Sequence, residues 1–477
     1  MELYNNIASV LSKKGINLTV GSTYDFQEIW KSWYRGNVND FHYYKARVNG
    51  KDIECERKTM NMPKKVCEDI TKLLWTEKTR IELSNKNATK RLWEVLDNKE
   101  NSFTVNFPIF LEKALAIGTG ATIEYKNEEG KTIIDYLDGT VVIPYKYTNS
   151  YISGLITVSR FVEEIRKKKI YYTHITYHEY EKGVYRRLNE LYKSSVETEL
   201  GKGEDFSSKF PNVKELDEIK TDTPRFQVFK PNMANNFDMD SPMGISVLAN
   251  SIDRFKSIDM KYDSFDREFK LGKKRILVDP TAMKAQMVAD QEGNTHLVQY
   301  FDTEDEAYVG INGMEGQPVK DVDFSLRTQE HIDAINAELN WLSSNVGLGE
   351  NFYKFDGNTV YKNQQEVMSE NSQAFRTKTH YDIIANDVVY DLVKVICEME
   401  GIKTNKITII PDDSIIEDKN TEQLRAQQEV TAGLRSKKTY LMDIKGMTEQ
   451  EAEEELQRIQ DEKMSNQEAF GIIPNEE

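Results

Sequence analysis

Two histidines, His174 and His178, have the spacing in this sequence that most nearly suits a metal ion. On a helix, residues four apart lie on one face and can bind zinc together. Here the histidines alternate with tyrosines such as Tyr177, a pattern typical of a β-strand, where residues four apart also share a face. We therefore expect the two histidines to pair at the surface of a strand and to bind no metal.

Other stretches that could support catalysis also have a simpler explanation. Gly118-Thr119-Gly120-Ala121 follows a predicted helix and precedes a predicted strand, whereas a dinucleotide-binding fingerprint has the strand first. It is predicted to cap the end of the helix. The sequence contains no phosphate-binding Gly-x-x-x-x-Gly-Lys-Ser/Thr and no Gly-x-Ser-x-Gly motif. Acidic runs such as Asp412-Asp413 and Glu453 to Glu455 are typical of solvated turns or helix faces. We expect no catalytic residue and no cofactor.

The overall charge restricts how the chain can meet nucleic acid. Among 477 residues, 79 are acidic and 63 basic, which gives a net charge of -16. A general nucleic-acid binder gains affinity by neutralising phosphates with Lys and Arg, so DNA contacts of this chain must be local or weak. The three cysteines, Cys55, Cys67 and Cys397, favour neither a disulfide framework nor a zinc site. The first 20 residues lack the apolar core of a signal peptide, and no run of 18 apolar residues predicts a membrane span.

The first half of the sequence predicts helices followed by a sheet. Apolar residues at helical spacing predict helices over 26–34, 62–74 and 103–116. Alternation predicts strands over 121–125, 132–137, 140–144, 151–161 and 170–180. Asn127 to Gly130 and Asp138-Gly139 are predicted hairpin turns, and Lys202 to Asp222 is predicted to be a polar loop.

The second half predicts long helices around a small β-rich unit. A helix is predicted from Gly244 to Lys270, then strands over 275–324, a helix over 328–346, and a break at Gly347-Leu348-Gly349. After an aromatic loop, Glu350 to Lys362, Asn363 and Glu366 form a capping box. The helix that follows is about 38 residues, on the order of 57 Å. A strand over 407–410 and an acidic helical segment over 420–470 complete the chain.

This order resembles that of the portal (head-to-tail connector) proteins of tailed bacteriophages, of the type found in long-tailed phages of Gram-positive hosts. Short stretches carry the likeness, and their order over nearly the whole chain matters more than any one of them. They are Trp30-Lys31-Ser32-Trp33-Tyr34-Arg35-Gly36, Arg57-Lys58-Thr59-Met60-Asn61-Met62, Ser241-Pro242-Met243-Gly244-Ile245-Ser246, Gly347-Leu348-Gly349 and Thr431-Ala432-Gly433-Leu434-Arg435-Ser436-Lys437-Lys438-Thr439.

The resemblance implies an α+β fold, an elongated portal-type subunit that assembles into a ring. Its expected parts are a wing of helices and antiparallel sheet (1–241), a first stem helix (242–270), a β-rich clip (271–325), a second stem helix (326–346), a tunnel loop (347–362), a spine helix with a strand returning to the wing (363–416) and a helical crown (417–477).

The resemblance also implies a function and partners. A ring of twelve copies would sit at one capsid vertex of the virion, after assembly in the host cytoplasm, and pass double-stranded DNA without sequence preference during packaging, retention and ejection. It would dock the large terminase and then a head-completion or adaptor protein, and contact the major capsid and scaffolding proteins. It would have no membrane partner.

Two groups of residues are candidates for DNA contact under this resemblance. The tunnel loop carries Asn351, Phe352, Tyr353, Lys354, Phe355, Asp356 and Lys362, and the junction of stem and clip carries Lys273, Lys274 and Arg275. The loop aromatics are expected to pack against the spine helix or a neighbouring loop, because the bases of a duplex are not exposed. The basic trio fits a solvated turn or intersubunit ion pairs equally well. Deleting residues 349–362 is expected to spare folding and ring assembly yet impair packaging or DNA retention.

Two other functions remain possible from the sequence. One is another phage structural protein, such as a baseplate or tail component, which gives no reason for two helices flanking a β-rich unit. The other is a metal-dependent enzyme of nucleic-acid metabolism, which requires carboxylates converging from several strands.

Overall fold

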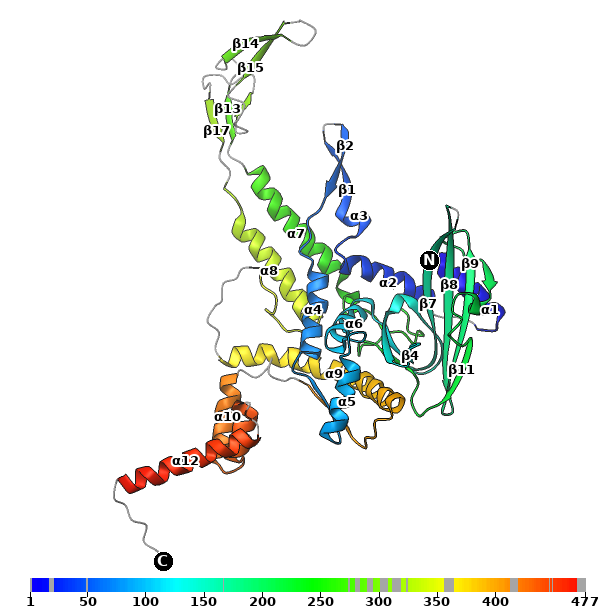
Figure 1. The fold of residues 1–477 in the computed structure, drawn as a ribbon. Helices are drawn as coiled ribbons and strands as arrows, with labels where there is room; N and C mark the ends of the chain where they lie inside the picture. The colour runs from blue at the N-terminus through cyan, green and yellow to red at the C-terminus, as the bar shows by residue number, and fades with distance from the viewer. Residues whose placement is uncertain are drawn as a thin grey trace, which may run out of the picture. The chain divides into compact units, whose positions relative to one another are not determined.

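The structure is a computed structural model that describes residues 2–16, 21–48, 50–165, 167–272, 275–278, 284–289, 295–300, 308–310, 319–322, 325–355, 364–411, 419–445, 447 and 449–469. It divides into two compact units, Met1–Ile410 and Pro411–Glu477, and each is considered by itself. The mixed helix-and-sheet architecture expected from the sequence is confirmed (Figure 1).

Helices dominate the first part of the larger unit. They are α1 (Glu2–Lys13), α2 (Gly21–Tyr34), α3 (Asn39–His42), α4 (Met62–Leu74), α5 (Lys86–Leu96) and α6 (Phe103–Ile117). Helix α4 has Pro63 in its first turn, where a missing N–H costs nothing, and buries Val66 and Ile70. Helix α6 ends at Gly118, whose φ of 90° is the left-handed cap predicted for this glycine. The predicted helices over 26–34, 62–74 and 103–116 are confirmed.

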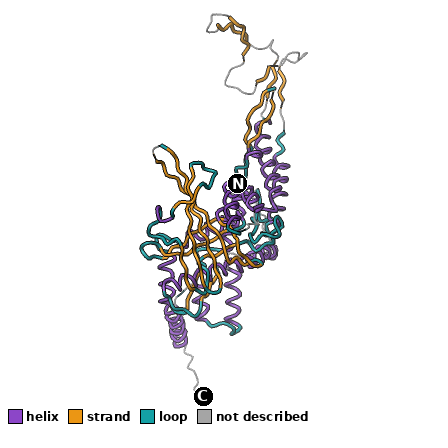
Figure 2. The backbone as a smooth tube through the Cα atoms, turned by 90° about the vertical axis from the view of Figure 1, so that its right-hand side faces the viewer, coloured by secondary structure: helices purple, strands orange, loops and turns teal. Residues whose placement is uncertain are grey.

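Two sheets follow, and Figure 2 shows their strands gathered together. The smaller has the order β12-β4-β5, from β4 (Gly120–Lys126), β5 (Thr132–Asp138) and β12 (Phe226–Phe229). The larger has the order β10-β9-β8-β7-β6, with β11 also paired to β9. Its strands are β6 (Val142–Thr148), β7 (Tyr151–Ile165), β8 (Lys168–Glu181), β9 (Val184–Ser194), β10 (Lys202–Glu204) and β11 (Leu216–Lys220).

Two predictions in this region are wrong. Asp138-Gly139 is not a hairpin turn, because a short 3-10 helix, η1 (Gly139–Val141), carries the chain from β5 in one sheet to β6 in the other. The polar stretch Lys202 to Asp222 is not simply a loop, since β10 and β11 both pair with β9. The turn at 127–130 is confirmed, and the Asn127 side chain accepts the N–H of Lys131 at 3.0 Å.

A helical hairpin begins later than the sequence predicted. Helix α7 spans Ile252–Leu271 and is preceded by η3 (Ala249–Ser251), so the predicted start at Gly244 is wrong. Residues 242–249 are buried as irregular chain. The Val247 N–H donates to the Leu115 carbonyl at 3.1 Å, and a Cβ on Gly244 would collide with the Gly118 carbonyl. This close approach to the end of α6 replaces the first turns of the helix. The partner helix, α8 (Thr328–Asn345), lies where predicted.

The expected β-rich unit between the two helices is present. Its described strands are β13 (Arg275–Val278), β14 (Lys284–Ala289), β15 (Thr295–Tyr300), β16 (Tyr308–Gly310) and β17 (Val319–Val322). They form one sheet of order β16-β13-β17 and a β14-β15 pair. The sequence also predicts turns at Gly293-Asn294 and at Gly310 to Gly316; both lie outside the described residues except for Gly310, which ends β16.

The long helix and the returning strand are confirmed. Helix α9 (Gln364–Glu400) buries Val389, Leu392, Val393 and Ile396 in the main apolar core. Strand β18 (Ile407–Ile410) then pairs antiparallel with β3 (Arg80–Leu83). The predicted N-cap, Asn363, lies outside the described residues. The remaining strands, β1 (Tyr43–Val48) and β2 (Lys51–Glu56), form a separate hairpin.

The smaller unit is helical, as predicted, with α10 (Lys419–Thr431), α11 (Lys437–Lys445) and α12 (Glu449–Ala469). Among its described side chains, the buried apolar ones are Ala426 and Ala452. Ion pairs add to this small core: Lys438 pairs with Glu453, and Arg435 with Asp443.

Candidate functional site

Helices α7 and α8 pack side by side around one carboxylate, Glu338 of α8. It accepts hydrogen bonds from Lys261 Nζ at 2.9 Å, Ser257 Oγ at 3.0 Å and Arg254 Nη1 at 3.3 Å, all on α7. Burial alone raises the pKa of Glu338, but the hydrogen bonds from Lys261 and Ser257 outweigh it and hold this pKa below its ordinary value. The ionised Glu338 therefore ties the two helices together.

A second carboxylate, Glu268, joins the helices near the C-terminal end of α7. It accepts two hydrogen bonds from the Arg327 guanidinium, at 3.0 and 2.7 Å, and lies 3.7 Å from His331 Nε2. The hydrogen bonds from Arg327 lower the pKa of Glu268 to about 2. A bidentate arginine–carboxylate pair fixes geometry as well as charge, so it sets how α7 and α8 align.

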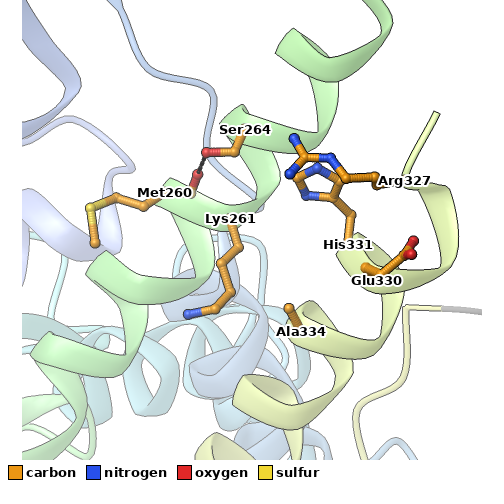
Figure 3. Close-up of a pocket in the computed structure, with 7 residues that line it drawn as sticks. All are labelled: Met260, Lys261, Ser264, Arg327, Glu330, His331 and Ala334. Atoms are coloured by element: carbon orange, nitrogen blue, oxygen red, sulfur yellow. Dashed lines mark hydrogen bonds between the residues drawn. The ribbon is translucent and has the colours of Figure 1, made fainter. Parts of the chain in front are cut away.

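A hollow of about 340 Å³ lies between α7 and the start of α8 (Figure 3). Its lining residues are Met260, Lys261 and Ser264 from α7, and Arg327, Glu330, His331 and Ala334 from the start of α8. Three of its polar lining side chains already have partners: Lys261 bonds to Glu338, Ser264 Oγ donates to the Met260 carbonyl at 2.7 Å, and Arg327 bonds to Glu268.

Three aspartates of α7 hold an extended segment of the chain. Asp259, Asp263 and Asp266 are spaced so that they share one helix face. The Met60 N–H donates to Asp259 Oδ1 at 2.9 Å and the Lys58 N–H to Asp263 Oδ1 at 3.2 Å. Lys58 Nζ lies 2.7 Å from Asp266 Oδ1. Residues 57–60, between β2 and α4, therefore lie along α7.

A buried histidine completes this contact. His42 Nε2 lies 3.1 Å from Asp259 Oδ2, and both side chains are at most 3% exposed. The Val38 N–H donates to His42 Nδ1 at 2.9 Å. Because Nδ1 accepts a hydrogen bond, the ring proton is on Nε2, which donates a hydrogen bond to Asp259 Oδ2.

Helix α8 holds the chain segment that follows it in the same way. Asn336, Asn340 and Ser343 also share one helix face. The Phe355 N–H donates to Asn336 Oδ1 at 2.8 Å, the Asn351 N–H to Asn340 Oδ1 at 3.1 Å, and the Tyr353 N–H to Ser343 Oγ at 3.1 Å. Positive φ angles at Gly347, Gly349 and Asn351 let the chain reverse after α8.

The side chains of this segment divide into two groups. Tyr353 is 7% exposed and belongs to the main core, and the Phe355 ring meets Tyr262 and Phe265 of α7 edge-on at 6.2 and 5.9 Å. Phe352 is 45% exposed, and Lys354 is exposed as well. Residues 351–355 therefore lie docked on α8 and present two side chains outward.

Comparison with known families gives one match over nearly the whole chain. Residues 24–469 match the family described as phage portal protein, SPP1 Gp6-like. The chain belongs to this phage portal protein family. Two solved structures are similar at 10% identity and a TM-score of 0.40: the neck of a native GTA particle computed with C12 symmetry, covering 80% of this chain and 89% of that one, and the neck of an empty GTA particle computed with C6 symmetry, covering 81% and 88%. No curated protein matched.

In this portal protein, the structure places part of the predicted tunnel loop. Phe352 and Lys354 face outward, whereas the Tyr353 and Phe355 side chains pack within the subunit, Phe355 against α7. Asp356, Lys362, Lys273 and Lys274 lie outside the described residues. Arg275 begins β13, and its side chain is likewise not described. Contact of these residues with DNA stays a prediction.

The structure argues against the expectation that deleting residues 349–362 spares folding. Tyr353 fills part of the core, and removing it would leave a cavity. Asn336, Asn340 and Ser343 would also lose the amides that they bind. Point substitutions at the outward side chains are the better probe of the loop.

The two histidines of β8 are placed differently from the prediction. His174 and His178 share a face of the strand, but His178 is 2% exposed, so surface pairing is wrong. Its Nδ1 lies 2.7 Å from the Tyr185 hydroxyl, and His174 Nε2 lies 3.1 Å from Asn189 Oδ1. Within the described residues, no group of three or more His, Cys, Asp or Glu side chains could hold a metal.

The remaining sequence candidates are also placed. Asp412 and Asp413 lie outside the described residues, and Glu453 to Glu455 lie on α12. The cysteines are free, and burial raises the pKa of the Cys397 thiol to about 11, which disfavours the reactive thiolate. None of the described helices combines the length and apolar character that a bilayer crossing requires.

Sequence reasoning missed the residues that hold this site together. Glu338 and the acceptors on α7 and α8 were not among the candidate residues. A signal was present, because Asp259, Asp263 and Asp266 and then Asn336, Asn340 and Ser343 repeat at four and three residues. Polar residues at that spacing share one helix face and can bind a neighbouring chain segment.

Proposed function

We propose that this chain forms a ring of twelve subunits that serves as the DNA channel at one capsid vertex, with α7 and α8 as the stem around that channel. The observation that carries the proposal is membership of residues 24–469 in a phage portal family. The ring would admit DNA during packaging, retain it in the virion and release it on ejection.

The exposed side of the α7–α8 hairpin supports contact between neighbouring copies. Trp341 is 60% exposed, with the Arg254 guanidinium 5.5 Å from its ring centre, and Met260 is 47% exposed. A hollow of about 330 Å³ lies beside Trp341, lined by Ala337, Asn340, Ser344 and Glu350 as well. Large apolar side chains on a surface are typical of protein contacts, and a head-to-tail contact that closes on itself makes a ring.

Weak DNA contact would come from the docked segment after α8. Lys354 offers a positive charge and Phe352 an apolar surface, and neither has the fork geometry that reads base edges. The net charge of -16 per subunit repels the duplex over most of a ring, so that it slides rather than binds. The basic trio Lys273, Lys274 and Arg275 is a second candidate contact.

The partners follow from the same proposal. Residues 271–325 would bind the large terminase during packaging and a head-completion or adaptor protein afterwards. The ring would also contact the major capsid and scaffolding proteins.

Electron cryomicroscopy of the purified chain tests the ring directly. We expect closed rings with a central opening wide enough for a duplex, and native mass spectrometry should give twelve subunits. Compact monomers at micromolar concentration, with no shared opening, would overturn the proposal.

A pair of lysine substitutions tests the DNA contact. Lys354→Gln is expected to leave rings intact and to change the amount of DNA packaged or retained in particles assembled with the variant. Lys182→Gln is the matched control, because Lys182 is an 88%-exposed lysine at the turn between β8 and β9. If particles of both variants and of the wild type contain equal amounts of DNA, the proposed contact of Lys354 with DNA is wrong.

A further inference from the structure

The larger sheet has a polar face in an enclosed position. Side chains directly opposite in an antiparallel register share a face, and the register pairs Thr157 with Thr176, Thr176 with Asn189, and His178 with Arg187. Asp217 of β11 stands opposite Arg187 on the same face. One face of β7, β8, β9 and β11 is therefore lined with polar groups.

The other face of this sheet is apolar and covered. Ile156, Ile175 and Tyr177 pack in one cluster with Ile7 and Leu11 of α1. In a sheet with one covered face, the polar face normally meets water. Here it does not, since His178 and Asn189 are 2% exposed and Thr176 is 8% exposed.

A cavity of about 520 Å³ accounts for this arrangement. It lies between the polar face and the smaller sheet, which contributes Ile123 and Tyr125 from β4 and Asp135 and Leu137 from β5. Small-molecule sites in proteins typically enclose about 300 to 1,000 Å³ and combine an apolar wall with a few fixed polar groups.

Most polar groups in the cavity are already fixed by one another. His178 Nε2 lies 3.2 Å from Thr157 Oγ1, and the Thr176 hydroxyl donates to Asn189 Oδ1 at 3.1 Å. The Asn189 amide donates to the Lys214 carbonyl at 2.9 Å. This network holds the floor of the cavity rigid, which suits a preformed binding site.

Arg187 is the exception among the described side chains that line the cavity. Its Nε is buried without a hydrogen-bond partner, and the nearest carboxylate, Asp217, is 3.7 Å from Nη2, beyond hydrogen-bonding distance. Burial, and then the charge of Arg187, lower the pKa of His178 to about 3, so the histidine adds no second charge. A guanidinium so weakly paired in a poorly solvated site is stabilised by an anion.

An aromatic cluster lines the same cavity as Arg187. The His174 ring lies 5.2 Å from Phe206 and 5.3 Å from Phe210, and the two phenylalanines stack on each other at 5.0 Å. All three residues line the cavity. A flat ring in a ligand would find there the stacking surface that aromatic pairs prefer.

We propose that this cavity binds a small planar organic anion, whose carboxylate or phosphate pairs with Arg187 and whose ring rests against His174, Phe206 and Phe210. An aromatic carboxylate and a mononucleotide both have this chemistry. The proposal concerns residues 123–217 alone and stands whether or not the chain forms a ring around DNA.

Binding to the purified full-length chain tests the proposal with three probes: benzoate, adenosine monophosphate and inorganic phosphate. Isothermal titration calorimetry should show saturable binding of benzoate or adenosine monophosphate. Benzoate represents the aromatic carboxylates and adenosine monophosphate the mononucleotides. We expect Arg187→Gln to weaken that binding by about ten-fold or more, as loss of a charge-assisted contact implies.

The control is the neighbouring residue. Arg186→Gln removes an arginine on the opposite face of β9, where it pairs with Glu218 at 2.7 Å, and should bind like the wild type. If Arg187→Gln does not fold, Arg187→Lys serves instead. It keeps the positive charge but loses the paired N–H donors of the guanidinium, and it should bind the probes more weakly than the wild type does. Saturable binding of neither organic probe, phosphate bound as tightly as both, or equal binding by the wild type and the Arg187 variants would overturn the proposal.

Discussion

The two sides of the α7–α8 hairpin hold chain segments with the same spacing and different chemistry. On α7, the aspartates at 259, 263 and 266 bind residues 57–60, and on α8, the neutral side chains at 336, 340 and 343 bind residues 351–355. Spacings of four and then three residues place three acceptors on one helix face in both cases. The difference is that one set of acceptors carries charge and the other does not.

That difference decides what each contact requires. A buried carboxylate needs a partner that offsets its desolvation, and the α7 side supplies His42 for Asp259 and Lys58 for Asp266. Amide and hydroxyl acceptors are buried at lower cost, so the α8 side needs no such partner. We therefore expect the α7 contact to contribute most to stability at Asp259, where it is most buried. We expect it to depend on pH at Asp266, where it is more exposed.

The largest effect is expected at Asp259. Asp259→Ala leaves the buried His42 Nε2–H and the Met60 N–H without their acceptor, and should lower the free energy of unfolding by about 3 kcal/mol. Urea unfolding of the purified chain measures it. Asp253→Ala is the control on the same helix, since its side chain is 95% exposed, and should change stability by less than about 0.5 kcal/mol. Equal effects would contradict the importance of the buried pair.

A smaller effect is expected on the neutral side. Ser343→Ala removes the acceptor of the buried Tyr353 N–H, and should cost about 1 to 2 kcal/mol in the same unfolding measurement. The half-buried neighbour Ser344 provides the control, and Ser344→Ala should be close to neutral. A loss at Ser343 as large as that at Asp259 would remove the distinction between charged and neutral contacts.

The smallest effect is a difference in pH response. Hydrogen bonds from Lys58 and Lys270 lower the pKa of Asp266. Its contribution is therefore complete above the ordinary pKa of about 4 and is lost as pH falls through the lower value of the folded state. As pH falls from 7 to about 2, through the lowered pKa of Asp266, amide hydrogen exchange, corrected for intrinsic rates, should lose protection at Lys58 and Met60 before it does at residues 351–355.

Asp266→Asn is the control for that experiment. It keeps an acceptor for Lys58 but removes the titrating group, so the early loss of protection near Lys58 should disappear. If both segments lose protection at the same pH in the wild type, the charged contact has no special acid sensitivity.

Much of this architecture could be predicted from periodicity, and the failures have physical causes. Helix α4 was predicted with its exact bounds because Pro63 and an apolar stripe mark it clearly. The start of α7 was misplaced because residues 242–249 are buried on all sides, and a buried irregular segment is as apolar as a buried helix turn. Strand β9 was missed because Arg187 and Asn189 point into a polar cavity and break the expected alternation.

The candidate site was predicted only in outline. Gly347, Gly349 and the aromatic residues marked a chain reversal after α8, which the structure confirms. Backbone hydrogen bonds from residues 351–355 to α8 fix the direction of each side chain in this segment. They turn Tyr353 inward and Phe352 and Lys354 outward. The spacing of Asn336, Asn340 and Ser343 indicates that α8 can bind a chain segment, but it does not say which residues bind there or which of their side chains turn outward.

The pairing of β18 with β3 joins residues more than three hundred positions apart. The strand at 407–410 fastens the last part of the larger unit to residues 80–83. The strand ladders and apolar clusters described for that unit are therefore complete by Ile410. Insertions, exchanges or substitutions in the sequence after Ile410 could therefore arise in evolution without disturbing the strand pairs and apolar clusters of the larger unit. Loss of this pairing would free residues 407–410 from the edge of β3.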